Sequence, residues 1–154
     1  MAGQVYWQDV NEGDHIPPLA KNCSSQQLVQ WAAGSGDFYQ IHYDETFAKG
    51  TGLKDIIVHG ALKGAFLGQL LHDWAGDEGR IKKYACSYRG MDYANQEIVC
   101  RGVITKKYRD GDEHIVELDI WTETGPAADD GRAKNPEGVK TTPGSAVVVL
   151  PSRQ

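Results

Sequence analysis

The chain has 154 residues, with 16 lysines and arginines against 21 aspartates and glutamates, for a formal net charge of -5. This length is enough for one domain with its own hydrophobic core. The acidic balance argues against a nucleic-acid partner, because phosphate binding requires a clustered excess of Lys and Arg. No apolar run approaches the roughly 20 residues of a membrane span, so we expect no membrane association.

The first quarter of the chain predicts an edge segment and a short helix. Residues 5–19 are expected to form a short strand or turn segment that wraps the edge of the domain. Ser24 and Gln27 then have the spacing of a capping box, and apolar residues follow at helical spacing. Gly34 marks the expected end of this helix, just before Asp37.

The second predicted helix runs from Gly60 to Trp74 and is apolar nearly all round, so it must be largely buried. After Lys83 the hydrophobic period changes from helical to alternating, which predicts strands. The expected strands cover residues 84–88, 98–108, 114–121 and 145–150, with a hairpin turn at Asp110-Gly111. One buried helix followed by antiparallel strands predicts an α+β fold, in which a single curved sheet wraps a central apolar helix.

Residues 124–144 lie between the last two expected strands. They are rich in glycine, proline and charge, and they have no hydrophobic period. Such a segment predicts a long flexible loop.

The three cysteines, Cys23, Cys86 and Cys100, are odd in number and far apart. They have no Cys-x-x-Cys or Cys/His ligand spacing, so the sequence predicts free thiols in a reducing compartment and no zinc site. The chain starts without the basic and apolar regions of a signal peptide, and we therefore expect a cytoplasmic protein.

Asp37, His42 and the His59-Gly60 pair are the residues that indicate chemistry. Asp37 and His42 converge only if the chain bends between them, because five residues turn a helix by about 500° and leave strand residues on opposite faces. Glycines at positions 34 and 36 make such a bend plausible. The Gly60 amide is expected at a helix N-terminus, where N–H groups lack partners and partial positive charge accumulates.

These segments resemble the MaoC-type (R)-specific enoyl-CoA hydratases and dehydratases of the hotdog fold. In that family an Asp-x-Asn-Pro-[Ile/Leu/Val]-His segment is followed by Ala/Val-His-Gly at the start of the central helix. Here the two segments are Asp37-Phe38-Tyr39-Gln40-Ile41-His42 and Val58-His59-Gly60, so Tyr39 and Gln40 replace the usual Asn and Pro. The resemblance also covers residues 43–48, the strands after Arg89 and the final strand.

The resemblance implies one hotdog domain over residues 1–154 and a hydro-lyase activity. The reaction is the reversible hydration of a trans-2-enoyl thioester to the (R)-3-hydroxyacyl thioester, with CoA or an acyl-carrier protein as the substrate's carrier. Asp37 and His42 would be its acid-base pair, and the Gly60 amide would stabilise the thioester oxygen. The family also implies no metal or redox cofactor, and a homodimer or higher homo-oligomer.

Other interpretations of the same residues stay open. Taken alone, Asp37 fits a turn or cap residue and His42 a structural histidine. His59 is assigned to the support of the site, beside the substrate. Three lysines around the motif are expected either to contact phosphates of the carrier or to lie on solvated faces. These lysines are Lys49, Lys54 and Lys63.

Two other functions compete with hydration. A hotdog thioesterase would act on the same carrier but would hydrolyse the thioester. A non-enzymatic partner subunit of a heteromeric hydratase is suggested by the altered motif at Tyr39 and Gln40.

Overall fold

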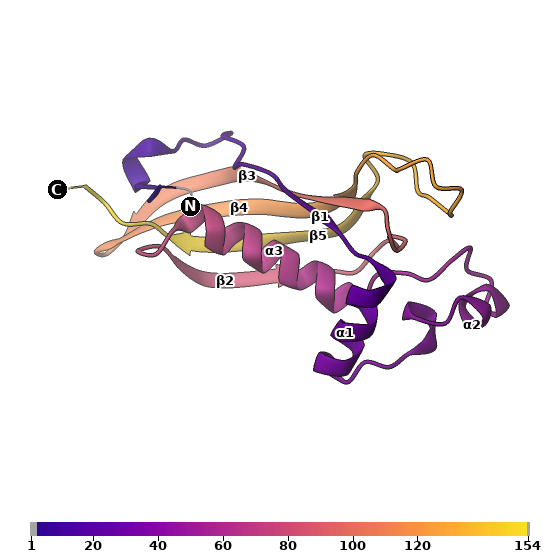
Figure 1. Cartoon of the computed structure of the whole chain (residues 1–154). Helices are drawn as coiled ribbons and strands as arrows, with labels where there is room; N and C mark the ends of the chain where they lie inside the picture. The colour runs from indigo at the N-terminus through magenta and orange to yellow at the C-terminus, as the bar shows by residue number, and fades with distance from the viewer. Residues whose placement is uncertain (1–2, 154) are drawn as a thin grey trace.

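The computed structural model describes residues 3–153, which form a curved antiparallel sheet with one long helix across its face (Figure 1). The strand order is β1-β3-β4-β5-β2. The helices are α1 (Ser25–Ser35), α2 (Glu45–Gly50) and α3 (Gly60–Ala75), with 3-10 turns at Trp7–Asp9 and Gln40–His42. The strands are β1 (Leu19–Asn22), β2 (Arg80–Cys86), β3 (Glu97–Asp110), β4 (Glu113–Thr124) and β5 (Lys140–Val149).

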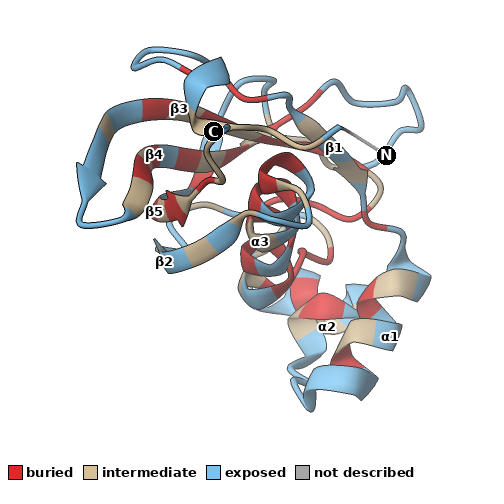
Figure 2. Ribbon diagram, turned by 90° about the vertical axis from the view of Figure 1, so that its left-hand side faces the viewer, coloured by how far each residue is buried: buried red, intermediate tan, exposed pale blue. Residues whose placement is uncertain are grey.

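The long helix α3 is the centre of the core. Leu67 and Leu71 on α3 are fully buried, and they belong to one hydrophobic cluster with Val116 and Leu118 of β4. Burying each such side chain contributes about 1.5–3 kcal/mol. Figure 2 shows buried residues along α3 and the strands that it crosses. The predicted α+β architecture, with a curved sheet around an apolar helix, is confirmed.

The hairpin of β3 and β4 is also confirmed and is longer than expected. Its register pairs Asp110 with Glu113 at the turn, where Gly111 has a φ of 58°. This left-handed backbone conformation favours glycine.

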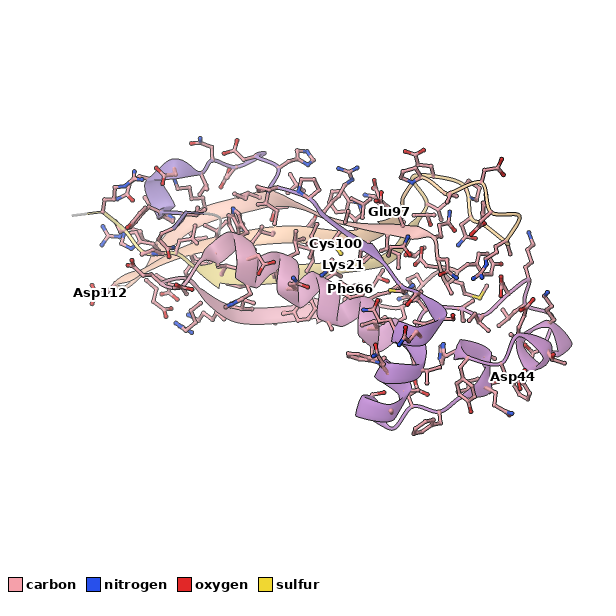
Figure 3. The ribbon with its side chains drawn as sticks, viewed as in Figure 1. Lys21, Asp44, Phe66, Glu97, Cys100 and Asp112 are labelled. Carbon is pink, nitrogen blue, oxygen red and sulfur yellow. The ribbon has the colours of Figure 1, made fainter. Side chains whose placement is uncertain are left out.

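Figure 3 shows Lys21 of β1 near Phe66 of α3, and the Lys21 Nζ lies 5.4 Å from the Phe66 ring centroid. Within residues 3–153, no helix combines the length and hydropathy needed to cross a membrane.

The structure corrects the expected boundaries of the first half of the chain. Residues 5–19 contain a 3-10 turn and a single bridge from His15 to Val103, and the edge strand β1 begins only at Leu19. Helix α1 continues through Gly34 and ends at Ser35. Its C-cap residue Gly36 has a φ of 78°, and the Gly36 N–H bonds the Ala32 carbonyl. Helix α2 was not expected at all. It is too short to show a helical period.

The expected loop at residues 124–144 is shorter in the structure. Its last five residues belong to β5, which begins at Lys140 because the main chain there pairs with Glu123 of β4. The remaining loop is held by polar contacts. Gln96 and Asn135 exchange two hydrogen bonds between the Gln96 side chain and the Asn135 main chain, at 2.8 and 2.9 Å, and the Asn135 amide donates to the Met91 carbonyl.

A buried ion pair joins α3 to the segment that follows β2. Lys63 and Asp92 are 1% and 0% exposed, and the Lys63 Nζ lies 3.0 Å from the Asp92 Oδ2. The carboxylate also accepts hydrogen bonds from the hydroxyls of Thr124 and Thr141, at 3.0 and 2.6 Å. Lys63 donates a second hydrogen bond to the Gly90 carbonyl. Both charges are desolvated, so each depends on its partners.

We expect Lys63→Met to lower the free energy of unfolding by about 3–5 kcal/mol, because it leaves the Asp92 carboxylate buried without its cation. Urea unfolding followed by circular dichroism measures this change. Lys49→Met is the matched control: Lys49 pairs with Glu45 on the surface of α2, where water screens the charges, so its effect should be far smaller. Equal effects of the two substitutions would contradict a structural role for the buried pair.

Candidate active site

Asp37 and His42 come together through a tight turn between α1 and α2. The Asp37 Oδ1 accepts a hydrogen bond from the Tyr39 N–H at 3.3 Å, and the 3-10 turn at Gln40–His42 then reverses the chain. The two side chains face each other, with 4.0 Å between the His42 Nε2 and the Asp37 Oδ2. The expected bend is therefore present. The Asp37 side chain is 50% exposed, whereas that of His42 is 9% exposed. The pair is therefore accessible to solvent on the Asp37 side, and the His42 ring lies behind it in the protein.

Hydrogen bonding fixes the proton position of neutral His42. Its Nδ1 lies 2.8 Å from the main-chain carbonyl of Ile57, which can only accept. Neutral His42 therefore carries its proton on Nδ1 and presents an unprotonated Nε2 to the Asp37 carboxylate. Tyr39, which stands where the hallmark has Asn, contacts His42 edge to face with 6.4 Å between the ring centroids.

His59 contacts both residues of the pair from the interior of the protein. Its ring is fully buried and stacks on that of His42, with centroids 3.8 Å apart and planes inclined by 19°. The His59 Nε2 lies 3.2 Å from the Asp37 carbonyl, and its Nδ1 is buried without a partner among the described residues. Burial lowers the pKa of His59, and the neighbouring His42 lowers it further. His59 is thus held neutral and does not reach the surface where a substrate would bind.

Gly60 lies directly after His59, as the first residue of α3. The His59 side chain makes no capping hydrogen bond to the helix, so it leaves the N–H groups of the first turn available to a ligand. These amides carry partial positive charge at the end of a 16-residue helix. An acceptor that develops negative charge would be stabilised there.

The three lysines do not share one environment. Lys49 and Lys54 are exposed, and Lys49 forms a surface ion pair with Glu45. Lys63 is buried in its pair with Asp92. Both interpretations of Lys63, as a phosphate contact or as part of a solvated face, are therefore wrong, because its ammonium has no access to solvent.

Asp37, His42 and His59 also place three potential metal-ligand atoms within 4.8 Å of one another. A metal at one bonding distance from both imidazoles would have to lie near the plane of each ring. The two planes are nearly parallel and 3.8 Å apart at their centroids, so their lone pairs do not converge. The arrangement fits proton transfer better than metal coordination.

A surface cavity of about 770 Å³ lies at the other end of α3, lined by Pro17, Leu70 and Trp74 among others. None of the candidate site residues Asp37, His42, His59 and Gly60 lines it. At 1.5 Å per residue, α3 separates its own ends by roughly 24 Å. The cavity is therefore distant from Gly60.

Asp92 is the residue near the site that the sequence analysis missed. Its carbonyl accepts a hydrogen bond from the Val58 N–H at 2.8 Å, next to His59, and its side chain holds Lys63 one turn into α3. Asp92 stands in a mixed polar stretch between Met91 and Tyr93, which has no pattern that indicates a buried carboxylate. Its partner Lys63 lies 29 residues away in the sequence, so the pair was not predicted.

Together, Asp37 and His42 present two proton acceptors 4.0 Å apart, beside free amides at the start of a helix. A water molecule between them would donate one hydrogen to each. This set can polarise water next to a carbonyl whose oxygen meets the helix N-terminus.

Several known proteins share this fold. The (R)-hydratase from A. caviae involved in PHA biosynthesis is 26% identical, with a TM-score of 0.74 over 94% of this chain and 99% of that chain. R-hydratase PhaJ1 from Pseudomonas aeruginosa has a TM-score of 0.78 at 16% identity, over 97% and 88% of the two chains. The ChsH1-ChsH2 complex from Mycobacterium tuberculosis gives 0.72 at 19% identity, over 91% and 98%. These likenesses confirm the hotdog fold.

A curated relative adds a match of partial length. Fatty acid synthase beta subunit TOXC from Cochliobolus carbonum is 33% identical over 78 residues, which is 49% of this chain and 4% of that protein. The chain thus spans a very small part of this relative. A family model described as a MaoC like domain matches residues 10–123, which is well over half of the chain. The chain belongs to the MaoC-like family.

Proposed function

We propose that the protein is a hydro-lyase that adds water reversibly to a trans-2-enoyl thioester and forms the (R)-3-hydroxyacyl thioester. The main observation behind this proposal is the pair of facing proton acceptors, Asp37 Oδ2 and His42 Nε2, near the start of α3, where the His59 side chain does not cap the helix. Membership of the MaoC-like family and the likeness to an (R)-hydratase at 26% identity support this reaction.

Water attacks the β-carbon in this scheme. Asp37 and His42 each accept one hydrogen of the water molecule, which points an oxygen lone pair at the substrate. As the C–O bond forms, the His42 Nε2 takes the proton, and the nearby Asp37 carboxylate stabilises the resulting imidazolium. The pair of electrons from the carbon–carbon double bond moves onto the thioester oxygen.

The Gly60 amide holds that oxygen while it carries negative charge. The charge then returns to the α-carbon, which takes the proton from His42 on the same face. Water is consumed, its proton and hydroxyl are both in the product, and Asp37 and His42 return to their starting states. No electron leaves the substrate, so the scheme requires no redox cofactor.

We expect Asp37→Asn and His42→Ala each to lower kcat by about 10² to 10⁴, because positioned acid-base groups typically contribute that much. The loss of enoyl absorbance with crotonyl-CoA measures the rate. His72→Ala is a matched control, since His72 is exposed near the far end of α3. Its rate should equal that of the unmodified protein. If both site variants retained more than half of the rate, Asp37 and His42 would not be the catalytic residues.

The same assay separates hydration from the two competing functions. A thioesterase would release free CoA from saturated and unsaturated substrates, which a thiol reagent detects. A non-catalytic partner subunit would show no rate when purified alone. We expect hydration without thiol release.

We also propose that two copies of the chain pair through β2. Among the described strands, β2 lies at one edge of the sheet with seven residues, whereas β1 at the other edge has four. An unpaired edge of this length is usually covered or paired. Light scattering should therefore give twice the mass of one chain at micromolar concentration. A monomer under these conditions would contradict the pairing.

The loop after β4 is proposed to control access of the acyl or carrier part. Figure 1 shows it at the same end of the molecule as α1 and α2. The pKa of Glu45 on α2 is lowered mainly by Lys49 and also by Arg132 of the loop, so the loop lies close enough to α2 for its charge to act there. Within the loop, Asp130 lies 3.9 Å from both Arg132 and Lys134, so these charges pair with one another.

Deletion of residues 127–133, closed by a Gly-Ser turn, tests this role. It spares the bonds of Asn135 to Gln96 and Met91, and those that join Gly138 and Val139 to Thr124. Loop closure depends weakly on length, so the fold should survive. We expect a changed KM or chain-length preference with kcat on the best substrate within about threefold, as a binding role implies. A loss of kcat on every substrate would contradict an access role, as would unchanged kinetics.

A further inference from the structure

Tyr88 lies directly against the residue that starts α3. A Cβ atom on Gly60 would lie 2.8 Å from the Tyr88 Cγ and 2.9 Å from its Cδ2. The ring therefore rests on the Gly60 Cα, in space that any larger residue at position 60 would occupy. Yet Tyr88 is 57% exposed, which is unusual for an aromatic ring that makes so close a contact.

The backbone on both sides of Tyr88 is fixed. The Ser87 N–H bonds the Pro143 carbonyl at 2.9 Å, and the Arg89 N–H bonds the Thr141 carbonyl at 3.0 Å. The buried Lys63 ammonium holds the carbonyl of Gly90 at 2.8 Å. The segment is thus tied to β5 and to α3. With the main chain held, the Tyr88 ring changes its position by rotation about its side-chain bonds, which exposed side chains undergo rapidly.

The ring extends along α3 past its first turn. Its hydroxyl lies 3.2 Å from the position of a Cβ on Gly64, and the Tyr84 hydroxyl lies 3.4 Å from the same point. Tyr84 is fixed because it donates a 2.6 Å hydrogen bond to the Gly64 carbonyl. One turn further, a Cβ on Gly68 would meet nothing within 4 Å. The Tyr88 ring therefore covers α3 from Gly60 to Gly64, and the space beside the helix is open at Gly68.

We propose that Tyr88 sets the acyl-chain specificity of the enzyme by occupying the space beside Gly60 into which a longer acyl chain would extend. The inference rests on the proposed function, which places the thioester oxygen at the Gly60 amide. That placement brings the acyl carbons within a few ångströms of the Gly60 Cα. A short acyl group fits beside the ring, whereas a long one must displace it.

The test compares three variants on crotonyl-CoA and trans-2-decenoyl-CoA. In Tyr88→Ala, the ratio of kcat/KM for the long substrate to that for the short one should rise at least about tenfold, as expected when a pocket gains room for several methylenes. Tyr88→Phe keeps the ring and should keep the ratio. Tyr108→Ala removes a tyrosine that bonds Glu117 on β4, away from α3, and should also keep it. An unchanged ratio in Tyr88→Ala would overturn the proposal.

A purely structural role for Tyr88 would change the unfolding midpoint and leave this ratio unchanged, so thermal unfolding of each variant is measured alongside. Binding of butyryl-CoA and decanoyl-CoA by calorimetry separates the specificity proposal from the proposed reaction, because neither thioester can be hydrated. If Tyr88→Ala shifts the binding ratio but no variant hydrates an enoyl thioester, the specificity role of Tyr88 is supported and the proposed reaction is overturned. If the protein hydrates both substrates with unchanged ratios in Tyr88→Ala, only the specificity role is overturned. Failure of the unmodified protein and Tyr88→Ala to bind either thioester would overturn both.

Discussion

The fixed start of α3 is the constraint on which the rest of the site depends. Packing of α3 on the sheet sets the direction of its axis, and the main-chain bonds of residues 57 and 58 set where it begins: Ile57 N–H bonds the Ile41 carbonyl, and Val58 N–H bonds that of Asp92. The same short segment supplies the carbonyl that orients His42. A shift of the helix would therefore displace the amide and the imidazole together.

Polar groups inside the fold serve this placement. The ion pair of Lys63 and Asp92 contributes little to net stability compared with an apolar pair of the same shape. What it provides is a fixed connection between the first turn of α3, the segment carrying Tyr88 and the hydroxyls of β4 and β5. The cost of breaking it makes alternative positions of that segment unfavourable.

The sequence predicted those elements whose period is carried by many residues. The apolar run of α3 and the alternation of β3 and β4 determine their own structure, so both were identified, and the bend between Asp37 and His42, after Gly34 and Gly36, was anticipated. The short elements β1 and α2 were not, because four or six residues hold too little pattern. Lys63 was misjudged since its burial depends on Asp92, and Tyr88 was overlooked because its contact with Gly60 exists only after β2 packs beside α3.

The stack of His42 on His59 also links the site to acid stability. The pKa of His59 lies below that of an unfolded histidine, so the unfolded chain takes up a proton at a pH where the folded chain does not. This contribution is complete above the unfolded pKa of about 6.5 and declines as the pH falls through that value. In the proposed reaction, a neutral His59 next to His42 lets His42 receive a proton from water without a second charge against its ring. The same neutrality makes the fold less tolerant of mild acid.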